Sequence, residues 1–221
     1  QASSSAASDV YKRQEIIGSA GYFISTFFVN KTNLRTDEYG GNFSNKIRIA
    51  TEIVKGIRES VGEDFLIIFR IPAMDMLEGG MSWDEICTLG RALENAGVSI
   101  VSTHFSWHES PVPTIATMVP RAAFTSVTKR LKKVVNVPVI TSNRINMPDV
   151  AESVLANGDA DLVSMARPFL ADGKIFEKIK EGREDEINTC IACNQACLDH
   201  AFDKKEISLS LIHISEPTRQ L

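Results

Sequence analysis

The segment FLIIFRI, residues 65–71, decides the fold class of this chain. Its run of apolar residues is typical of a buried strand. The next segment, 82–96, has a helical pattern that opens with a capping box and is ended by Gly97. A second short apolar strand is predicted at 99–103. A strand, a helix and a strand of these lengths indicate a βαβ unit, and therefore a parallel sheet.

The same alternation of strands and helices continues on both sides of this unit. Counting the segments gives about five strands and four or five helices. A doubly wound sheet and a (β/α)8 barrel both fit that count. The remaining predicted segments are the end of a strand at 15–19, helices at 45–61, 124–134 and 147–156, strands at 137–141 and 160–165, and a mostly helical stretch at 168–182.

Polar residues at the carboxyl ends of the strands favour the barrel. They follow four of the predicted strands, and barrel enzymes build their sites from these positions. No G-x-G-x-x-G follows any strand, so the dinucleotide fingerprint of a doubly wound sheet is missing from this sequence. Because a whole barrel takes about 250 residues, we expect a partial α/β (β/α)8 TIM barrel, about strands four to eight. The residues concerned are Arg70, His104, 142–144 and 165–167.

Composition narrows the class of protein. The 221 residues are 43% hydrophobic and 24% charged, as is ordinary for a globular protein, and the net charge is −4. Without a long basic run, nucleic acid is not an expected partner. No run of eighteen apolar residues indicates a membrane span, and no signal peptide is recognisable. Clustered cysteines without a secretory signal favour a reducing, cytoplasmic location.

Three cysteines lie within eight residues, at Cys190, Cys193 and Cys197. The C-x2-C-x3-C spacing lets three thiolates from one loop converge on one metal centre. A [4Fe–4S] cluster needs four such ligands, and no cysteine follows position 197. A lone C-x2-C would also suit zinc, so a non-catalytic zinc-binding module is a second interpretation. Cys87, on a predicted helix, is expected to be a packed core thiol.

Both ends of the chain resemble translated sequencing-adapter read-through. The segments are QASSSAASDVYKRQ, residues 1–14, and residues 209–221 within SLSLIHISEPTRQL. A Ser-rich arm and a short terminal strand are the alternative interpretation. Excluding both ends leaves 15–186 as the C-terminal part of the barrel and 187–208 as the start of a cluster-binding segment.

Several motifs resemble those of known flavoenzymes. The segments 18–28, 32–41 and 45–48 (GSAGYFISTFF, TNLRTDEYGG and NKIR) resemble the motif after the fourth strand in the old yellow enzyme superfamily. The segments 106–121 and 188–202 are similar to those of bacterial NADPH-dependent 2,4-dienoyl-CoA reductases, which carry FMN, FAD and a 4Fe–4S cluster. The resemblance implies an acyl-CoA substrate, FMN in this barrel, and FAD and NADPH bound by a further portion. Enoate, bile-acid and cyclic-enone reductases share this layout and remain alternatives.

The resemblance also implies roles for individual residues in catalysis. Tyr22 would be the proton donor to the substrate, and His108 would act with it at the substrate carbonyl. The alternatives are an aromatic residue packing a loop and a histidine bonded to Glu109 or to backbone. Arg70 would face the flavin pyrimidine edge, with an internal salt bridge as the alternative.

Further residues are implied in binding. Arg144, Ala166 and Arg167 follow the two strands after which barrels commonly hold phosphate, and in the family these loops hold the FMN phosphate. Cys190, Cys193 and Cys197 would be cluster ligands, with Leu209 at the fourth ligand position. His104 and Ala122 replace small glycines of the family pattern, which puts acyl-chain preference in doubt. The expected substrate contacts are Lys31, His108, Glu109, Ser110 and Pro111.

Overall fold

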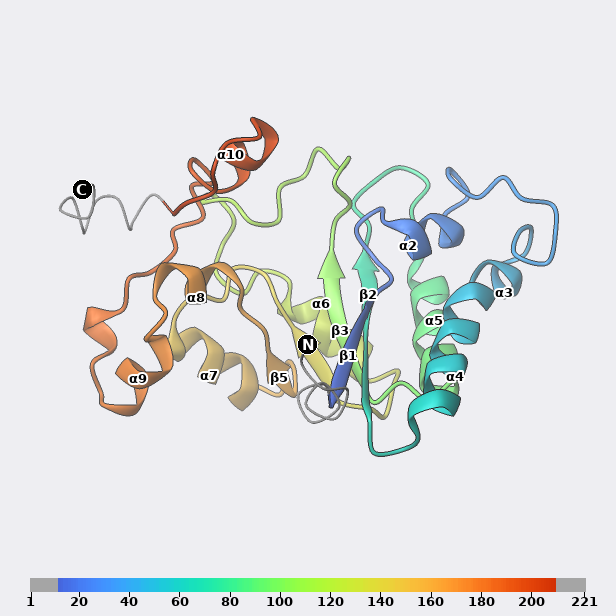
Figure 1. Cartoon of the computed structure of the whole chain (residues 1–221), viewed down its shortest axis with the longest axis horizontal. Helices are drawn as coiled ribbons and strands as arrows, with labels where there is room; N and C mark the ends of the chain where they lie inside the picture. The colour runs from blue at the N-terminus through green and yellow to red at the C-terminus, as the bar shows by residue number, and fades with distance from the viewer. Residues whose placement is uncertain (1–11, 210–221) are drawn as a thin grey trace, which may run out of the picture.

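In the part of the chain that the structure describes, five parallel strands form a single sheet whose spatial order follows the chain. The computed structural model describes residues 12–209, and each strand runs in the same direction as its neighbour (Figure 1). This is the α/β fold with a parallel sheet that the sequence predicts, and it is consistent with part of a TIM barrel. The strands are β1 (Arg13–Ile17), β2 (Leu66–Met74), β3 (Ile100–Phe105), β4 (Val139–Thr141) and β5 (Leu162–Val163).

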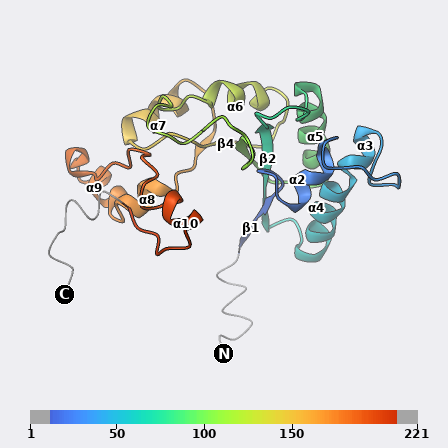
Figure 2. The ribbon, with the colours of Figure 1, turned by 90° about the horizontal axis from the view of Figure 1, so that it is seen from above.

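Helices connect the strands and cover one side of the sheet. Seen from above, α4, α5, α6 and α7 follow one another around its outside (Figure 2). None of the helices within residues 12–209 has the length and apolar character that crossing a bilayer requires. The helices are α2 (Phe23–Phe28), α3 (Phe43–Lys46), α4 (Arg48–Val61), α5 (Trp83–Asn95), α6 (Thr125–Lys132), α7 (Pro148–Ala156), α8 (Arg167–Ala171), α9 (Ile175–Lys180), the 3-10 helix η1 (Glu184–Glu186) and α10 (Leu198–Phe202).

Local signals in the sequence place the helix ends well. The Oγ of Ser82 accepts from the backbone N–H of Glu85, and the Glu85 carboxylate accepts from the backbone N–H of Ser82, so the predicted capping box is confirmed. Gly97 has φ 103° just after α5, and Pro148 is in the first turn of α7, both as predicted.

Other boundaries differ from the prediction. The helix predicted at 45–61 is interrupted at Ile47, which caps both α3 and α4. The stretch predicted at 168–182 forms two helices, and neither α2 nor α10 was predicted. β1 begins at Arg13, two residues before its predicted start, because Arg13 and Gln14 pair with β2. Of the adapter-like segments 1–14 and 209–221, only residues 12–14 and Leu209 lie within the described residues.

The side chains of β2 alternate between two environments. Ile67, Phe69 and Ile71 are 0% exposed and belong to one core cluster with residues of α4 and α5. The side chains between them, including Arg70, therefore face the inner side of the sheet. On that inner side several apolar residues stay open in the described part of the chain, with exposures of 43–44% at Ile17, Leu66 and Leu162. The predicted buried strand is thus fully buried on its outer face and partly exposed on its inner face.

Three buried threonines join α6 to the sheet. Thr128 of α6 lies 3.2 Å from the hydroxyl of Thr103 on β3 and 2.9 Å from that of Thr141 on β4. The Thr103 hydroxyl also donates to the carbonyl of Ile140. All three threonines are 0–1% exposed, so their hydroxyl groups depend on one another for hydrogen bonds.

We predict that Thr128→Val lowers the free energy of unfolding by about 1–3 kcal/mol, since it leaves the Thr141 hydroxyl buried without this partner. The matched control is Thr88→Val on the exposed face of α5, where the same change removes only a bond to the Asp84 carbonyl. Urea denaturation of both variants measures the difference. Equal losses at the two positions would contradict the role given to the buried hydroxyl chain.

Candidate active site

Tyr22 and His108 meet at the carboxyl edge of the sheet. Tyr22 caps α2 after β1, and His108 lies in the loop after β3. The Tyr22 hydroxyl is 2.7 Å from Nε2 of His108, and the two rings meet edge-on with centroids 5.0 Å apart. Tyr22 is 52% exposed, so the pair is open to a ligand. The structure therefore brings together the two residues predicted to act on one substrate.

Backbone contacts hold the two loops of this pair in place. The hydroxyl of Ser25 donates to the carbonyl of Tyr22 at 2.8 Å and lies 3.1 Å from that of Ser19. The backbone N–H of His108 donates to the carbonyl of Ala20 at 3.4 Å. The loops after β1 and β3 are thus bonded directly across the end of β2.

The predicted substrate contacts fall into two groups. Ser110 is anchored, with its hydroxyl donating to the carbonyl of Met76 at 2.7 Å. Glu109 and Pro111 are exposed beside His108. Lys31 is exposed in the loop after α2, and within residues 12–209 it forms no hydrogen bond or ion pair with the loop of His108. Its predicted contact with substrate stays a prediction.

Arg70 is engaged in a salt bridge on the inner side of the sheet. Its Nε and Nη2 donate to the two carboxylate oxygens of Glu15, each at 3.0 Å. Both side chains are about one-third exposed, at 33% and 34%. The internal salt bridge is therefore formed. Because a guanidinium has five N–H donors, Arg70 keeps donors for a further acceptor, and the flavin contact stays a prediction.

His104 lies on β3 with one buried nitrogen. Its Nδ1 makes no hydrogen bond within the described residues and has no access to solvent. Burial, together with the positive charges of Arg70 and His108, lowers the pKa of His104 to about 4. The imidazole is therefore neutral at pH 7, next to the two residues predicted to meet flavin and substrate.

The depressed pKa of His104 predicts a pH-dependent stability. Between its ordinary value of 6.5 and its folded value of about 4, the unfolded chain binds a proton that the folded chain does not. The stability that His104 contributes is complete above pH 6.5 and is lost as the pH falls through about 4. Urea denaturation at several pH values should therefore show a shallower slope over this window for His104→Gln. A variant with the wild-type slope would contradict the assignment.

Three arginines gather at the ends of β4 and β5. The pKa of Arg144 is lowered, first by burial and then by the charges of Arg121 and Arg167. Nε of Arg144 donates to the carbonyl of Val119 at 2.8 Å, which holds its side chain toward the loop after β3. An anion bound among these arginines would offset their mutual repulsion. Sequence reasoning missed Arg121, although its place at the end of the 106–121 motif was a usable signal.

The backbone at these strand ends is also unusual. Asn143 and Arg144 are consecutive non-glycine residues with φ of 70° and 57°. Such conformations are costly and cluster at ligand sites. Ala166, predicted to bind phosphate with Arg167, is exposed and caps the start of α8.

The three clustered cysteines line one cavity. Cys190, Cys193 and Cys197 share it with Arg167 and with Leu209, which is 8% exposed. The position predicted for a fourth ligand thus faces the same space as the three thiols. Within residues 12–209, however, no group of three or more histidine, cysteine or acidic side chains has a geometry ready to hold a metal ion. Cys87 is buried in α5, as expected, and burial raises the pKa of its thiol.

The cysteine segment is bound to the barrel loops. Asn146 donates through Nδ2 to the carbonyl of Cys190 at 2.8 Å. The hydroxyl of Thr117, in the loop that carries His108, donates to the carbonyl of Ile191 at 2.9 Å. Arg167 is bonded to Asn194 and lies 3.8 Å from the Cys197 sulfur. One loop therefore touches both the candidate active site and the cysteines.

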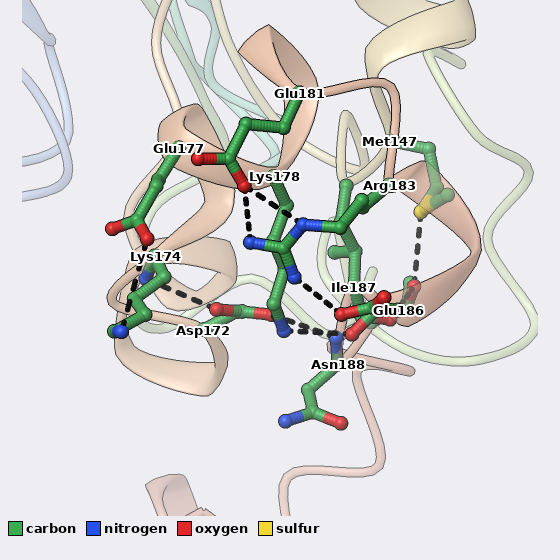
Figure 3. Close-up of polar contacts among 11 residues, drawn as sticks. Met147, Asp172, Lys174, Glu177, Lys178, Glu181, Arg183, Glu186, Ile187 and Asn188 are labelled. Carbon is green, nitrogen blue, oxygen red and sulfur yellow. Dashed lines mark hydrogen bonds and ion pairs between the residues drawn. The ribbon is translucent and has the colours of Figure 1, made fainter.

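A buried ion pair fixes the chain just before the cysteines (Figure 3). Lys178 donates to Asp172 at 2.7 Å, and the two side chains are 13% and 5% exposed. The same carboxylate oxygen accepts from the backbone N–H of Asn188 at 2.9 Å, and Lys178 also donates to the Glu186 carbonyl. Burial alone would raise the pKa of Asp172, but these hydrogen bonds lower it overall. No local pattern in the sequence indicates this ion pair, since charged side chains are solvated in most helices.

The fold and the open polar carboxyl edge are those of part of a (β/α) barrel with a ligand site. Comparison with known proteins identifies the family. Residues 2–186 match the NADH:flavin oxidoreductase / NADH oxidase family, and the chain belongs to it. This confirms the predicted membership of the old yellow enzyme superfamily.

The similar proteins are named for different activities. A metal reductase from Desulforamulus reducens is 42% identical over 194 residues, covering 88% of this chain and 29% of that protein. An NADH oxidase from Thermoanaerobacter brockii is 39% identical over 189 residues, covering 83% and 28%. A solved complex of 2-naphthoyl-CoA reductase with 2-naphthoyl-CoA has a TM-score of 0.86 at 35% identity, covering 90% of this chain and 31% of that one.

These matches identify the family of the chain but not one particular activity. It spans about three tenths of the length of the relatives that it matches. The family is established, whereas the narrower resemblance to 2,4-dienoyl-CoA reductases is not singled out by these relatives. Membership of the family implies FMN binding. The pKa of Arg144 is lowered first by burial and then by the charges of Arg121 and Arg167. A phosphate dianion bound there would offset both effects, so these arginines fit that group.

Proposed function

We propose that this chain forms the proton-donating and phosphate-holding part of a flavin-dependent reductase. The proposed reaction is reduction of a C=C bond conjugated to the carbonyl of an acyl-CoA thioester. The observation that carries the proposal is the exposed Tyr22–His108 pair, with 2.7 Å between phenol oxygen and imidazole nitrogen. The solved relative in complex with 2-naphthoyl-CoA, a conjugated acyl-CoA, supports the substrate class.

The reaction needs a hydride at one carbon, a proton at another, and stabilisation of charge on the carbonyl oxygen. Bound FMN would supply the hydride. Tyr22 would deliver the proton, since a phenol is neutral at pH 7 and this one lies at an open edge of the barrel. After transfer, the exposed phenolate can recover its proton from solvent.

His108 is proposed as the donor to oxygen atoms that gain negative charge. With the proton on Nε2, its N–H would point at the phenol oxygen and stabilise Tyr22 as it loses its proton. The same nitrogen would serve the thioester oxygen once substrate is bound, as the resemblance implies. Arg70 would place positive charge beside the flavin through the N–H groups not used by Glu15.

Binding of the cofactor phosphate is proposed for the arginine cluster. Arg144 and Arg167, with Arg121 beside them, would form charge-assisted hydrogen bonds to the FMN phosphate. Lys31, Glu109, Ser110 and Pro111 are proposed substrate contacts around His108.

Cys190, Cys193 and Cys197 are proposed as ligands of an iron–sulfur cluster. Such a cluster would pass single electrons to the flavin site. Support comes from the spacing and from the cavity that the three thiols share with position 209. FAD and NADPH, expected for a longer protein of this family, stay predictions. A non-catalytic zinc site is the competing interpretation.

The first test concerns the metal site. We predict that the present chain assembles at most an incomplete, oxygen-labile cluster, and that Leu209→Cys yields a four-iron cluster on anaerobic reconstitution, because position 209 faces the shared cavity. Iron and sulfide per chain are the measurement, with Leu209→Ser as the matched control. Preferential zinc binding with no sulfide retained would refute the cluster.

The second test concerns proton transfer. We predict that Tyr22→Phe slows reoxidation of dithionite-reduced, FMN-loaded protein by 2,4-dienoyl-CoA or 2-naphthoyl-CoA by ~10²–10⁴-fold, the usual cost of losing a positioned proton donor. The matched control is Tyr39→Phe, because the Tyr39 hydroxyl bonds to Glu52 and lies away from His108. Stopped-flow absorbance follows the flavin directly.

The outcomes separate the competing functions. Unchanged reoxidation in Tyr22→Phe would show that Tyr22 only packs, and the proposed function would fail. Faster reoxidation by cinnamate than by either thioester would favour an enoate reductase. Reoxidation by ferric citrate that is insensitive to Tyr22→Phe would favour metal reduction, the activity named for the 42% identical relative.

A further inference from the structure

Asp75 is a buried carboxylate directly after β2. It is 3% exposed, and each of its oxygens accepts one hydrogen bond. Oδ1 accepts from the indole Nε1–H of Trp107 at 2.7 Å, and Oδ2 accepts from the backbone N–H of Met81 at 2.8 Å. Its backbone carbonyl also accepts from the backbone N–H of Trp107 at 3.1 Å. Two hydrogen bonds therefore join Asp75 to a single residue of the loop after β3.

Trp107 contacts both halves of the candidate active site. It directly precedes His108, so its position fixes where the imidazole begins. On its other side the indole packs against Gly21, which precedes Tyr22. A Cβ at Gly21 would lie 2.9 Å from Cε3 of the indole, and Gly21 has φ 86°, so this close approach requires glycine. The indole thus lies between the chain segments that carry the phenol and the imidazole.

We propose that Asp75 is a positioning residue, which acts through Trp107 to hold His108 within hydrogen-bond distance of Tyr22. The catalytic part of this inference rests on the proposed function, in which that pair handles the proton. Asp75 forms no hydrogen bond to Tyr22 or His108 in the described structure, so we expect the effect of its side chain to pass through the indole of Trp107.

The cost of burying Asp75 agrees with a role beyond packing. Burial raises the pKa of this carboxyl, although the hydrogen bonds from Met81 and Trp107 oppose the shift. Carboxyl groups with perturbed pKa values cluster at functional sites. An asparagine has only one acceptor oxygen and would turn its NH2 group toward one of the two N–H donors. Asp75→Asn should therefore break one of the two contacts while nearly preserving volume.

The first measurement needs no flavin and no substrate. In this chain, NMR reports the Nε2 chemical shift of His108 and the titration of the Tyr22 phenol. We expect both signals to move in Asp75→Asn and in Trp107→Phe. The His108 signal should move toward its value in Tyr22→Phe, and the Tyr22 signal toward its value in His108→Ala. The matched control is Trp83→Phe, because Trp83 stacks on Arg130 and forms no hydrogen bond with Asp75 within residues 12–209. That variant should keep the wild-type signals.

The second measurement is the reoxidation of FMN-loaded protein by substrate. A misplacement of about 1 Å can cost on the order of 10²-fold in rate. We expect a loss of that order in Asp75→Asn, in the maximal rate more than in the substrate concentration at half-maximal rate. Because Trp107→Phe removes the indole N–H altogether, the double variant Asp75→Asn/Trp107→Phe should be no slower than Trp107→Phe alone if Asp75 acts through the indole.

The outcomes distinguish this inference from the proposed function. An Asp75→Asn protein that is less stable to heat but has wild-type His108 and Tyr22 signals would overturn the positioning role. If Asp75→Asn fails to fold, Trp107→Phe with wild-type signals would overturn it equally. Signals that move as expected, while Tyr22→Phe leaves reoxidation unchanged, would support the positioning role and refute the proposed function instead.

Discussion

The alternation of β2 is the constraint on which the rest of the structure depends. Ile67, Phe69 and Ile71 are fully buried against α4 and α5, so β2 cannot slip by one residue without exposing all three. This register turns Arg70 toward the inner side of the sheet. It also places Asp75, the first residue after β2, between the loops after β1 and β3, where its carboxylate binds Trp107 of the second loop.

The loop after β3, residues 106–121, joins parts of the molecule that have different chemistry. Near its start it carries His108, bonded to the Tyr22 loop. Further along, Val119 holds Arg144 at the candidate phosphate site, and Thr117 holds the cysteine segment. A displacement of this loop would disturb the Tyr22 loop, Arg144 and the cysteine segment, because each is joined to it by a direct hydrogen bond. Hydrogen bonds of this one loop thus join the candidate proton donor, the candidate phosphate site and the cysteine segment.

Features that depend on residues close together in the sequence could be predicted, whereas contacts between residues far apart in the sequence could not. The capping box at Ser82 and the alternation of strands and helices follow from local chemistry, which is why fold class and α5 were predicted correctly. Tyr22 and His108 were expected in one site only through family resemblance, and the structure shows the contact itself. Asp75 and Asp172 were missed because each acquires meaning from a partner on another element, which no local spacing reveals.

Unusual backbone conformations occur at the same carboxyl edge of the sheet as the candidate active-site residues. Four of the five strands are followed within three residues by a non-glycine residue with positive φ: Ala20, Met76, Ser106 and Asn143. Each such residue costs on the order of 1 kcal/mol or more. The apolar outer face of the sheet, packed on its helices, supplies the stability that offsets this strain. The turns that result bring the loops together at this edge, where Tyr22, Trp107 and Asp75, from three different strand ends, lie in one small cluster of contacts.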